Sequence, residues 1–239
     1  MRILEGEGVT KYFGGLAAVS NVDFHVDQGE VVGLIGPNGA GKTTLFNLIS
    51  AALVPKPGVI RFKGETITGL KPHQICRMGV ARTFQSIKVF PDMPVLDNVV
   101  LGAFFGMSPG MSSADAVREA TGLLEFVGLL AARATPAKDL TLVNQKRLEV
   151  ARALATKPEL LLLDELMAGL NPTETTQAME LVGRIRDRGI TILMIEHVMK
   201  AIMSVCGRIM VLHHGEKIAD GTPQEIATSK KVVEVYLGE

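Results

Sequence analysis

The chain has 239 residues, of which 47% are hydrophobic and 21% are charged, and its 25 basic side chains balance its 25 acidic ones. This composition excludes a globally disordered chain, which needs low hydrophobicity and high net charge. A formal charge of zero also argues against a protein that binds nucleic acid through a broad basic surface. The length suits one or two domains.

The cysteines and the hydropathy of the chain indicate in which cellular compartment the protein works. Cys76 and Cys206 lie far apart and form no CxxC pattern, so we interpret them as ordinary thiols of a reducing compartment. The first residues contain no apolar run of signal-peptide length. No stretch approaches the roughly 20 consecutive apolar residues of a membrane-spanning helix. We therefore expect a cytosolic protein that is not itself embedded in a membrane.

The first strand signals come early in the chain. Residues 22–27 alternate strictly between apolar and polar side chains, which is typical of a strand with one wet face. This pattern predicts an antiparallel sheet near the N-terminus. Residues 31–35 form a continuous apolar run, which is typical of a strand covered on both faces.

The segment after this apolar run matches the phosphate-binding pattern GxxxxGK[ST] in full. Its residues are Gly36, Pro37, Asn38, Gly39, Ala40, Gly41, Lys42, Thr43 and Thr44. Glycines let successive backbone N–H groups converge on phosphate oxygens, and the N-terminus of the next helix adds a partial positive charge. We expect Lys42 to bridge the β- and γ-phosphates of a nucleotide and the Thr43 hydroxyl to bind Mg²⁺.

Helical patterns follow the loop. They cover residues 45–53, 116–127 and 145–155. The stretch from about residue 86 to residue 155 contains no strong strand signal. We therefore interpret it as a helical insertion into an α/β core.

Two carboxylates end the next apolar run. Residues 160–163 are all leucine, and Asp164 and Glu165 follow them directly. Such a pair on its own is usually a solvated strand end, but a preceding P-loop favours a nucleotide site. We expect Asp164 to hold the hydration shell of Mg²⁺ and Glu165 to orient and polarise the attacking water. The adjacent Glu favours hydrolysis over the phosphate transfer of a kinase.

The last third of the chain returns to the α/β alternation. A helical pattern at 173–186 precedes apolar runs at 190–195 and 209–212. Buried strands that alternate with helices predict an α/β fold with a mostly parallel sheet, which collects its ligands at the carboxyl ends of the strands. The pair of histidines in 213–215 hints at a metal site, but adjacent side chains diverge, so we assign this segment to a hairpin turn.

The order of these elements resembles the nucleotide-binding subunit of an ABC transporter over nearly the whole chain. The resemblance implies that Gln85, at the end of its strand, touches Mg²⁺ and the attacking water, and that its loop leads to membrane subunits. It also implies that His197 contacts the γ-phosphate and that residues 168–171 form the D-loop. Phe13 matches the aromatic residue that stacks on adenine, and Tyr12 is the second candidate for this role. The alternative interpretation of Phe13 is a core residue.

The segment at 140–149 occupies the place of the ABC signature, LSGGQ, and of the basic, helical stretch that follows it. The resemblance implies that Thr141 offers its hydroxyl, in trans, to the γ-phosphate held by an opposite subunit. Leu142 and Val143 replace both glycines, and bulk there is expected to weaken ATP-driven closure of the dimer. Leu166 stands where the family commonly has proline.

The resemblance implies a P-loop NTPase fold of the α/β class, an ABC-type nucleotide-binding domain. Such a domain has a RecA-like core, an N-terminal antiparallel β subdomain and an inserted helical subdomain. A single domain then spans residues 1–239. Its core covers about 1–85 and 158–239, and its helical subdomain covers about 86–157.

Within the ABC family, several segments resemble the ATPases of importers for branched-chain and other hydrophobic amino acids, of the LivG type. These segments are 14–19, 81–99, 195–197, 221–223 and 235–239. The resemblance implies a subunit that binds and hydrolyses ATP, with Mg²⁺, to power such an importer. Transport of lipid or lipopolysaccharide by an exporter is the first alternative. The altered signature raises a second alternative, an ATP-binding regulatory module with weak hydrolysis.

The implied partners are a second ABC ATPase subunit, identical or homologous, and integral membrane permease subunits. A periplasmic or extracellular solute-binding protein takes part indirectly, and no nucleic acid is expected. The implied location is peripheral, on the cytoplasmic face of the cell membrane. ABC ATPases of translation or DNA repair usually carry tandem domains or long coiled coils, and neither fits in this chain.

Overall fold

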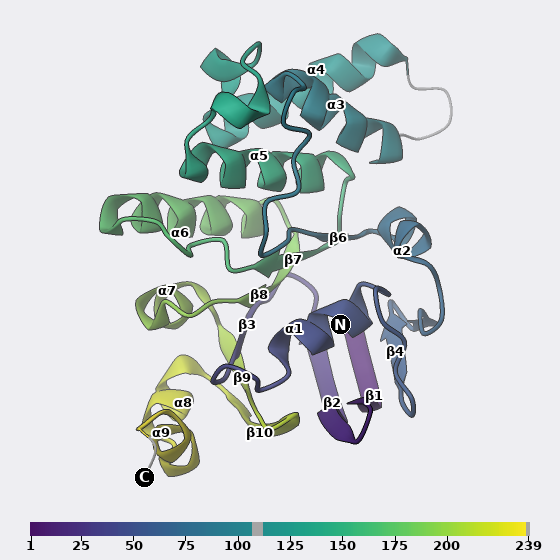
Figure 1. The fold of residues 1–239 in the computed structure, drawn as a ribbon, viewed down its shortest axis with the longest axis vertical. Coiled ribbons are helices and arrows are strands. Elements are labelled where there is room, and N and C mark those ends of the chain that lie inside the picture. Colours follow the sequence, from purple (N-terminus) through teal and green to yellow (C-terminus); the bar gives the residue numbers. More distant parts are fainter. Residues whose placement is uncertain (107–111, 238–239) are drawn as a thin grey trace.

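A computed structural model describes residues 1–106 and 112–237 of the chain (Figure 1). Part of the expected helical insertion, residues 107–111, lies outside the described residues. So do Gly238 and Glu239, the last two residues of the C-terminal motif.

An antiparallel sheet of four strands forms near the N-terminus, in the order β2-β1-β4-β5. Its strands are β1 (Arg2–Phe13), β2 (Leu16–Asp27), β4 (Val59–Phe62) and β5 (Glu65–Thr66). The alternation at 22–27 is the second half of β2, where Val22, Phe24 and Val26 are buried. The predicted antiparallel sheet is therefore confirmed.

A second sheet of six strands has the order β10-β9-β3-β8-β7-β6. Its strands are β3 (Val31–Ile35), β6 (Val80–Arg82), β7 (Leu160–Asp164), β8 (Thr191–Ile195), β9 (Arg208–His213) and β10 (Glu216–Gly221). All neighbouring pairs are parallel except the hairpin of β9 and β10. The four apolar runs thus form the parallel strands that were predicted from them.

The helices cover the parallel sheet and extend beyond it. They are α1 (Lys42–Ile49), α2 (Pro72–Met78), α3 (Val95–Gly106), α4 (Ser113–Val127), α5 (Leu142–Ala155), α6 (Pro172–Arg186), α7 (Met199–Val205), α8 (Pro223–Thr228) and α9 (Lys230–Leu237). Short 3₁₀ turns at Leu130–Ala132 and Ala137–Asp139 join α4 to α5. Figure 1 shows α3, α4 and α5 gathered at one end of the molecule. These helices fall in the stretch predicted to be helical, while the domain boundaries stay a prediction.

The parallel sheet lies between two hydrophobic cores, because successive side chains of a strand point to opposite faces. In β7, Leu161 and Leu163 join the core that contains α3 to α6, and Leu160 and Leu162 join the core shared with α1 and the antiparallel sheet. All four leucines are fully buried, and each contributes about 1.5–3 kcal/mol. The carboxyl end of β7 is therefore fixed from both sides.

Helix α6 begins where the sequence provides a complete N-terminal cap. The Asn171 side chain accepts a hydrogen bond from the Glu174 backbone N–H at 2.9 Å, and the Glu174 carboxylate accepts one from the Asn171 N–H at 2.9 Å. Pro172 supplies the helical φ at the first position. This cap fixes the end of the segment that follows Glu165.

Within the two described stretches of the chain, no helix combines the length and the apolar character that crossing a membrane requires.

Candidate functional site

Glycine is required at both ends of the predicted phosphate loop. Gly36, Gly39 and Gly41 have φ values of 152°, 81° and 102°. A Cβ atom at Gly36 would lie 2.1 Å from the carbonyl oxygen of Leu212, and one at Gly41 would lie 2.3 Å from that of Ala18. The loop therefore packs so tightly against β2 and β9 that no side chain fits at these two positions.

The Lys42 side chain folds back under this loop. Its Nζ donates hydrogen bonds to the carbonyl oxygens of Gly36, at 2.7 Å, and Pro37, at 3.0 Å. Burial lowers the pKa of Lys42, and the nearby charges of Glu165 and Asp164 oppose that shift. The structure thus brings the lysine, the phosphate loop and both strand-end carboxylates together, as predicted from their motifs.

Asp164 is buried at the end of β7 and keeps one oxygen without a protein partner. Its Oδ2 lies 2.7 Å from Nη2 of Arg82, and its backbone N–H donates to Oγ1 of Thr83 at 3.1 Å. Its Oδ1 is buried and has no hydrogen-bond partner. A carboxylate oxygen with free lone pairs is a ligand that Mg²⁺ or its bound water prefers, so the residues present fit the expected cation.

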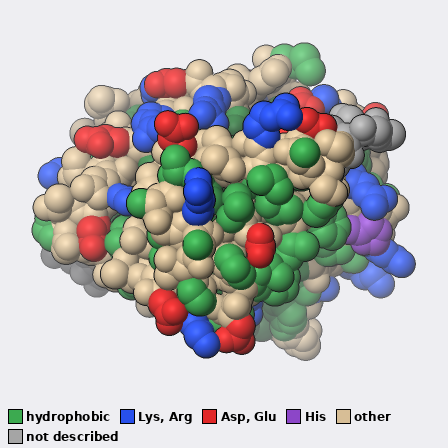
Figure 2. All heavy atoms as spheres, turned by 90° about the horizontal axis from the view of Figure 1, so that it is seen from above, with side chains coloured by type: hydrophobic (Ala, Val, Ile, Leu, Met, Phe, Trp, Pro, Cys, Tyr) green, Lys and Arg blue, Asp and Glu red, His purple; other side chains and the backbone are tan. Residues whose placement is uncertain are grey.

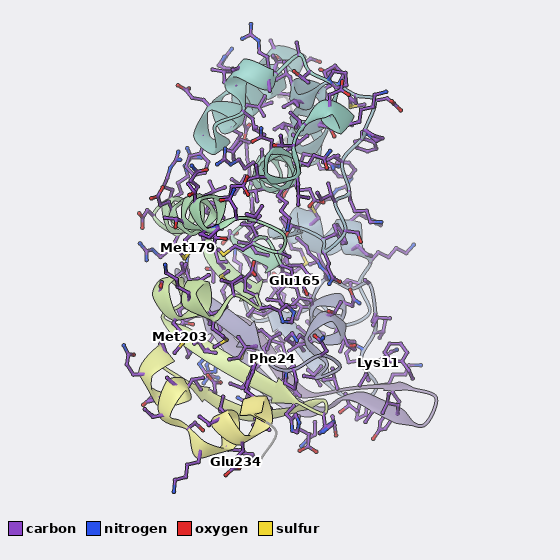
Figure 3. All side chains as sticks on the ribbon, turned by 60° about the vertical axis from the view of Figure 1, so that its left-hand side comes forward. Lys11, Phe24, Glu165, Met179, Met203 and Glu234 are labelled. Carbon is purple, nitrogen blue, oxygen red and sulfur yellow. The ribbon has the colours of Figure 1, made fainter. Side chains whose placement is uncertain are left out.

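Gln85 and His197 converge on the two oxygens of Glu165. Gln85 donates from Nε2 to Oε2 of Glu165 at 3.0 Å. His197 Nε2 lies 3.0 Å from Oε1 and donates when that nitrogen carries the proton. Figure 3 shows Glu165 near the middle of the molecule, between the helices at one end and the antiparallel sheet that carries Lys11 at the other. The loops after β6, β7 and β8 supply these three side chains, so neighbouring strands assemble the cluster.

Arg82 is a site residue that motif reasoning missed. Besides Asp164, its Nη1 donates to Oδ1 of Asn47, at 2.6 Å, and to Oγ of Ser50, at 3.0 Å. It therefore ties helix α1, which begins at Lys42, to the carboxylate at the end of β7. In the sequence, this residue could have been noticed as a charged side chain in the short apolar segment before Gln85.

Phe13 lies at the exposed tip of the β1–β2 hairpin. Its side chain is 50% exposed and that of Tyr12 is 52% exposed, so Phe13 is not a core residue. The same hairpin continues to Ala18, whose carbonyl oxygen abuts Gly41 of the phosphate loop. An exposed aromatic ring on a segment that packs against the phosphate loop is suited to stack on a nucleotide base.

The C-terminal helix also reaches the phosphate loop. Burial raises the pKa of Tyr236, and a backbone hydrogen bond from Gly36 opposes that shift. In the sequence, segment 235–239 is notable only for its resemblance to importer ATPases, which assigns no role to this tyrosine. The contact places α9 against the first residue of the loop.

The altered signature packs onto the segment after Glu165 within the same chain. Thr141 is the exposed N-cap of α5, and its hydroxyl makes no capping hydrogen bond. A Cβ atom at Gly169 would lie 3.2 Å from Cδ2 of Leu142, so the leucine covers this glycine. Val143 and Leu166 line one small cavity together. The substituted positions of the signature and of the Asp-Glu loop are thus neighbours.

The paired histidines lie in the β9–β10 hairpin turn, as predicted. His214 and Gly215 adopt positive φ values of 48° and 81°, and the rings of His213 and His214 are tilted by 53°. In the part of the chain that the structure describes, no cluster of three or more His, Cys, Asp or Glu side chains is arranged to hold a metal ion.

A groove of about 540 Å³ opens beside Gln85, between α2 and β6 on one side and α3 and α5 on the other. Its walls include Phe84, Phe90 and Phe105, whose rings are partly exposed. Basic side chains line it as well, among them Arg82 and Arg152. Figure 2, viewed from the end that carries α3 to α5, shows hydrophobic side chains gathered together with Lys and Arg nearby.

A phosphate loop beside two strand-end carboxylates, on a mostly parallel sheet with an antiparallel sheet and a helical part added, defines an ATP-binding cassette. The ABC transporter family model matches residues 19–168, and a model described as branched-chain amino acid ATP-binding cassette transporter matches residues 216–239. The chain belongs to the ABC transporter family, as an ABC-type ATPase.

Individual relatives agree over the full length. LivG of Salmonella typhimurium, a high-affinity branched-chain amino acid transport ATP-binding protein, is 42% identical over 250 residues, which cover 99% of this chain and 98% of the relative. A nucleotide-free ATP-binding cassette from an ABC transporter has a TM-score of 0.89 and 32% identity over 100% of both chains. A dimeric cassette bound to ADP and Pi has a TM-score of 0.84 and 25% identity, over 92% of this chain and 98% of that one. The chain is thus an ATP-binding subunit of the LivG type, and the predicted fold and family are confirmed.

Proposed function

We propose that this chain binds Mg²⁺ and ATP and hydrolyses the nucleotide to power import of branched-chain or other hydrophobic amino acids. The observation that carries hydrolysis is the convergence of Gln85 and His197, each at 3.0 Å, on Glu165. Likeness to LivG and the match of the C-terminal segment support the class of solute.

The proposed site assigns each step to a side chain. The loop from Gly36 to Thr44 binds the phosphates through its backbone N–H groups, which every residue except Pro37 supplies, and through the Lys42 ammonium. Thr43, Gln85 and Asp164 hold Mg²⁺, which neutralises charge on the phosphate oxygens when bound.

Glu165, the second residue of the Asp-Glu pair, is the general base in this proposal. Glu165 orients a water molecule towards the γ-phosphate and accepts its proton. His197 stabilises the charge that develops on the phosphate, and Gln85 keeps the Glu165 carboxylate facing the water. Phe13 stacks on the base.

A second ATPase subunit completes each nucleotide site in this proposal. Thr141 is exposed at the N-terminus of α5, with a hydroxyl that its own helix does not use. Its proposed role is to reach the γ-phosphate bound by the partner. The dimeric relative with ADP and Pi supports a dimer of such cassettes.

Permease subunits are the proposed occupants of the groove beside Gln85. Partly exposed aromatic rings and basic side chains suit an amphipathic segment with acidic residues, such as a helix on the cytoplasmic side of a permease. The chain then lies peripherally on the cytoplasmic face of the membrane. Copurification with permeases of an exporter, rather than with those of an amino-acid importer, would favour the lipid or lipopolysaccharide alternative.

The substitution Glu165→Gln tests the hydrolytic assignment. We expect the variant to bind ATP with unchanged affinity and to lose turnover, because an amide cannot accept the proton of water. The matched control is Glu180→Gln, which changes an exposed carboxylate on α6. Turnover of the Glu165→Gln variant at the wild-type rate would refute the proposed role of this residue.

The packing of Leu142 against Gly169 favours one other function, an ATP-binding regulatory module with weak hydrolysis. Steady-state ATPase activity of the purified chain, compared with that of the assembled transporter, separates the two. A transporter ATPase is stimulated in the complex, whereas a regulatory module stays near its basal rate in both preparations.

A further inference from the structure

The backbone at Glu165 adopts a conformation that the residue itself does not favour. Its φ is 51°, in the left-handed region, where a non-glycine residue carries a cost of about 1–3 kcal/mol. Such a conformation persists only if surrounding contacts hold it.

Three hydrogen bonds hold the turn from Glu165 to Met167, one from α5 and two from adjacent residues at the end of β8. The Glu165 N–H donates to the carbonyl oxygen of Ile195, at the end of β8, at 2.9 Å. The Lys146 ammonium, on α5, donates to the Glu165 carbonyl oxygen at 2.7 Å. The Glu196 carboxylate accepts the Met167 N–H at 2.7 Å. The carbonyl that begins the turn and the N–H that ends it are thus each bound by a charged side chain.

Both charged side chains are buried, at 7% exposure for Lys146 and 2% for Glu196. Burial lowers the pKa of Lys146, while the charges of Glu196, Glu149 and Glu165 oppose the shift. Burial also raises the pKa of Glu196, to about 7, against the hydrogen bond from Met167 and the charge of Lys146. Burying two ionisable side chains costs desolvation free energy, and in return each of them satisfies one backbone group of the turn, the Glu165 carbonyl or the Met167 N–H.

Both residues are also close in sequence to other parts of the site. Glu196 directly precedes His197, whose ring contacts Glu165, and Lys146 lies in the first turns of α5, just after the signature. The two residues therefore connect the elements that carry His197 and Thr141 to the backbone that carries the Glu165 carboxylate.

We propose that Lys146 and Glu196 are positioning residues that hold the turn after Asp164 so that the Glu165 carboxylate faces Gln85 and His197. This inference rests on the proposed role of Glu165 in hydrolysis. Neither residue touches the nucleotide; each acts on the backbone of the turn, through a hydrogen bond to one of its ends.

The test uses pairs of variants in the full chain and in the transporter complex that it copurifies. Lys146→Met and Glu196→Ala remove the hydrogen bonds, whereas Lys146→Arg and Glu196→Gln keep a donor or an acceptor. Arg147→Met is the control, because this neighbour on α5 bonds Gln177 on the surface instead. The readouts are hydrogen exchange of the Met167 amide, affinity for ATP, and the kcat and KM of hydrolysis.

We expect Lys146→Met and Glu196→Ala to speed exchange at Met167 and to lower kcat about 10–100-fold, a size typical of a misplaced catalytic group, with unchanged KM and ATP affinity. The Arg, Gln and control variants should stay near wild type. Unchanged exchange, a loss of affinity equal to the loss of kcat, or equal impairment in Glu196→Gln and Glu196→Ala would each overturn the inference.

Glu165→Gln, measured in parallel, separates this inference from the proposed function. If that variant still turns over, the assignment of Glu165 fails, and a positioning role in hydrolysis fails with it. If Glu165→Gln is inactive while Lys146→Met and Glu196→Ala keep full kcat, only the positioning role is refuted.

Discussion

The buried pair of Arg82 and Asp164 allows a quantitative test of how the site is held together. The two side chains are 7% and 1% exposed, with 2.7 Å between their charged atoms. Arg82→Met leaves the Asp164 carboxylate buried without its cation, and removing one partner of such a pair costs about 3–5 kcal/mol. Water can replace Arg82 at half-buried Asn47 and Ser50, so the loss arises mainly at Asp164.

The assay is urea unfolding of the nucleotide-free protein, supported by calorimetry. At about 2 °C or more per kcal/mol for a chain of this size, the variant should melt at least about 6 °C lower. The control is Arg61→Met, because Arg61 and Glu7 are also 2.7 Å apart but 33% and 61% exposed. An exposed pair of this kind contributes about 0–1 kcal/mol.

A double variant completes this test. Adding Asp164→Asn to Arg82→Met removes the unpaired charge, so the double variant should lose less stability than the two single variants together. A loss below about 1 kcal/mol in Arg82→Met, or strictly additive effects in the cycle, would refute the argument that the unpaired buried carboxylate dominates.

Three further outcomes follow from the site. The pKa of Glu196 is raised from 4.5 to about 7, so between these pH values the native state binds a proton that the unfolded state does not. The free energy of unfolding should therefore fall by roughly 3 kcal/mol as the pH rises from about 4.5 to about 7. Glu196→Gln should flatten this part of a urea-unfolding pH profile; an unchanged slope would contradict it. In a Glu165→Gln background, Leu142→Gly with Val143→Gly should strengthen ATP-induced dimerisation in gel filtration, and no change would show that bulk in the signature is harmless. Lys42→Ala should abolish ATP binding in calorimetry, since it removes the cation under the phosphate loop, and retained affinity would refute that role.

Local patterns predicted the elements whose character is written in consecutive residues. The leucine run of β7 and the loop from Gly36 to Thr44 carry their own signals, so their type and order could be read from the sequence. Strand β1 could not, because its pairing with β2 shifts register around Gly6 to Val9 and breaks the period of two. Helices α7, α8 and α9 have only 7, 6 and 8 residues, too few turns for a clear period.

The supporting residues of the site were less predictable than its motifs. Arg82 pairs with a residue 82 positions away, and Glu196 binds the backbone 29 positions away. Such contacts depend on the neighbouring order of β6, β7 and β8, which a single sequence does not specify. Motif residues are recognisable because their chemistry requires a fixed local spacing, whereas the groups that orient them need only proximity in the folded chain.

The groove and Asp164 share two side chains, and this has a thermodynamic consequence. Arg82 and Thr83 line the groove, and the same two side chains bind the carboxylate and the backbone of Asp164. A protein segment that enters the groove and displaces them changes the field and the geometry at Asp164. Thermodynamic linkage makes this effect reciprocal. If the bound segment changes the binding free energy of the nucleotide, the bound nucleotide changes the binding free energy of the segment by the same amount. Arg82 and Thr83 alone are enough to connect the groove with Asp164.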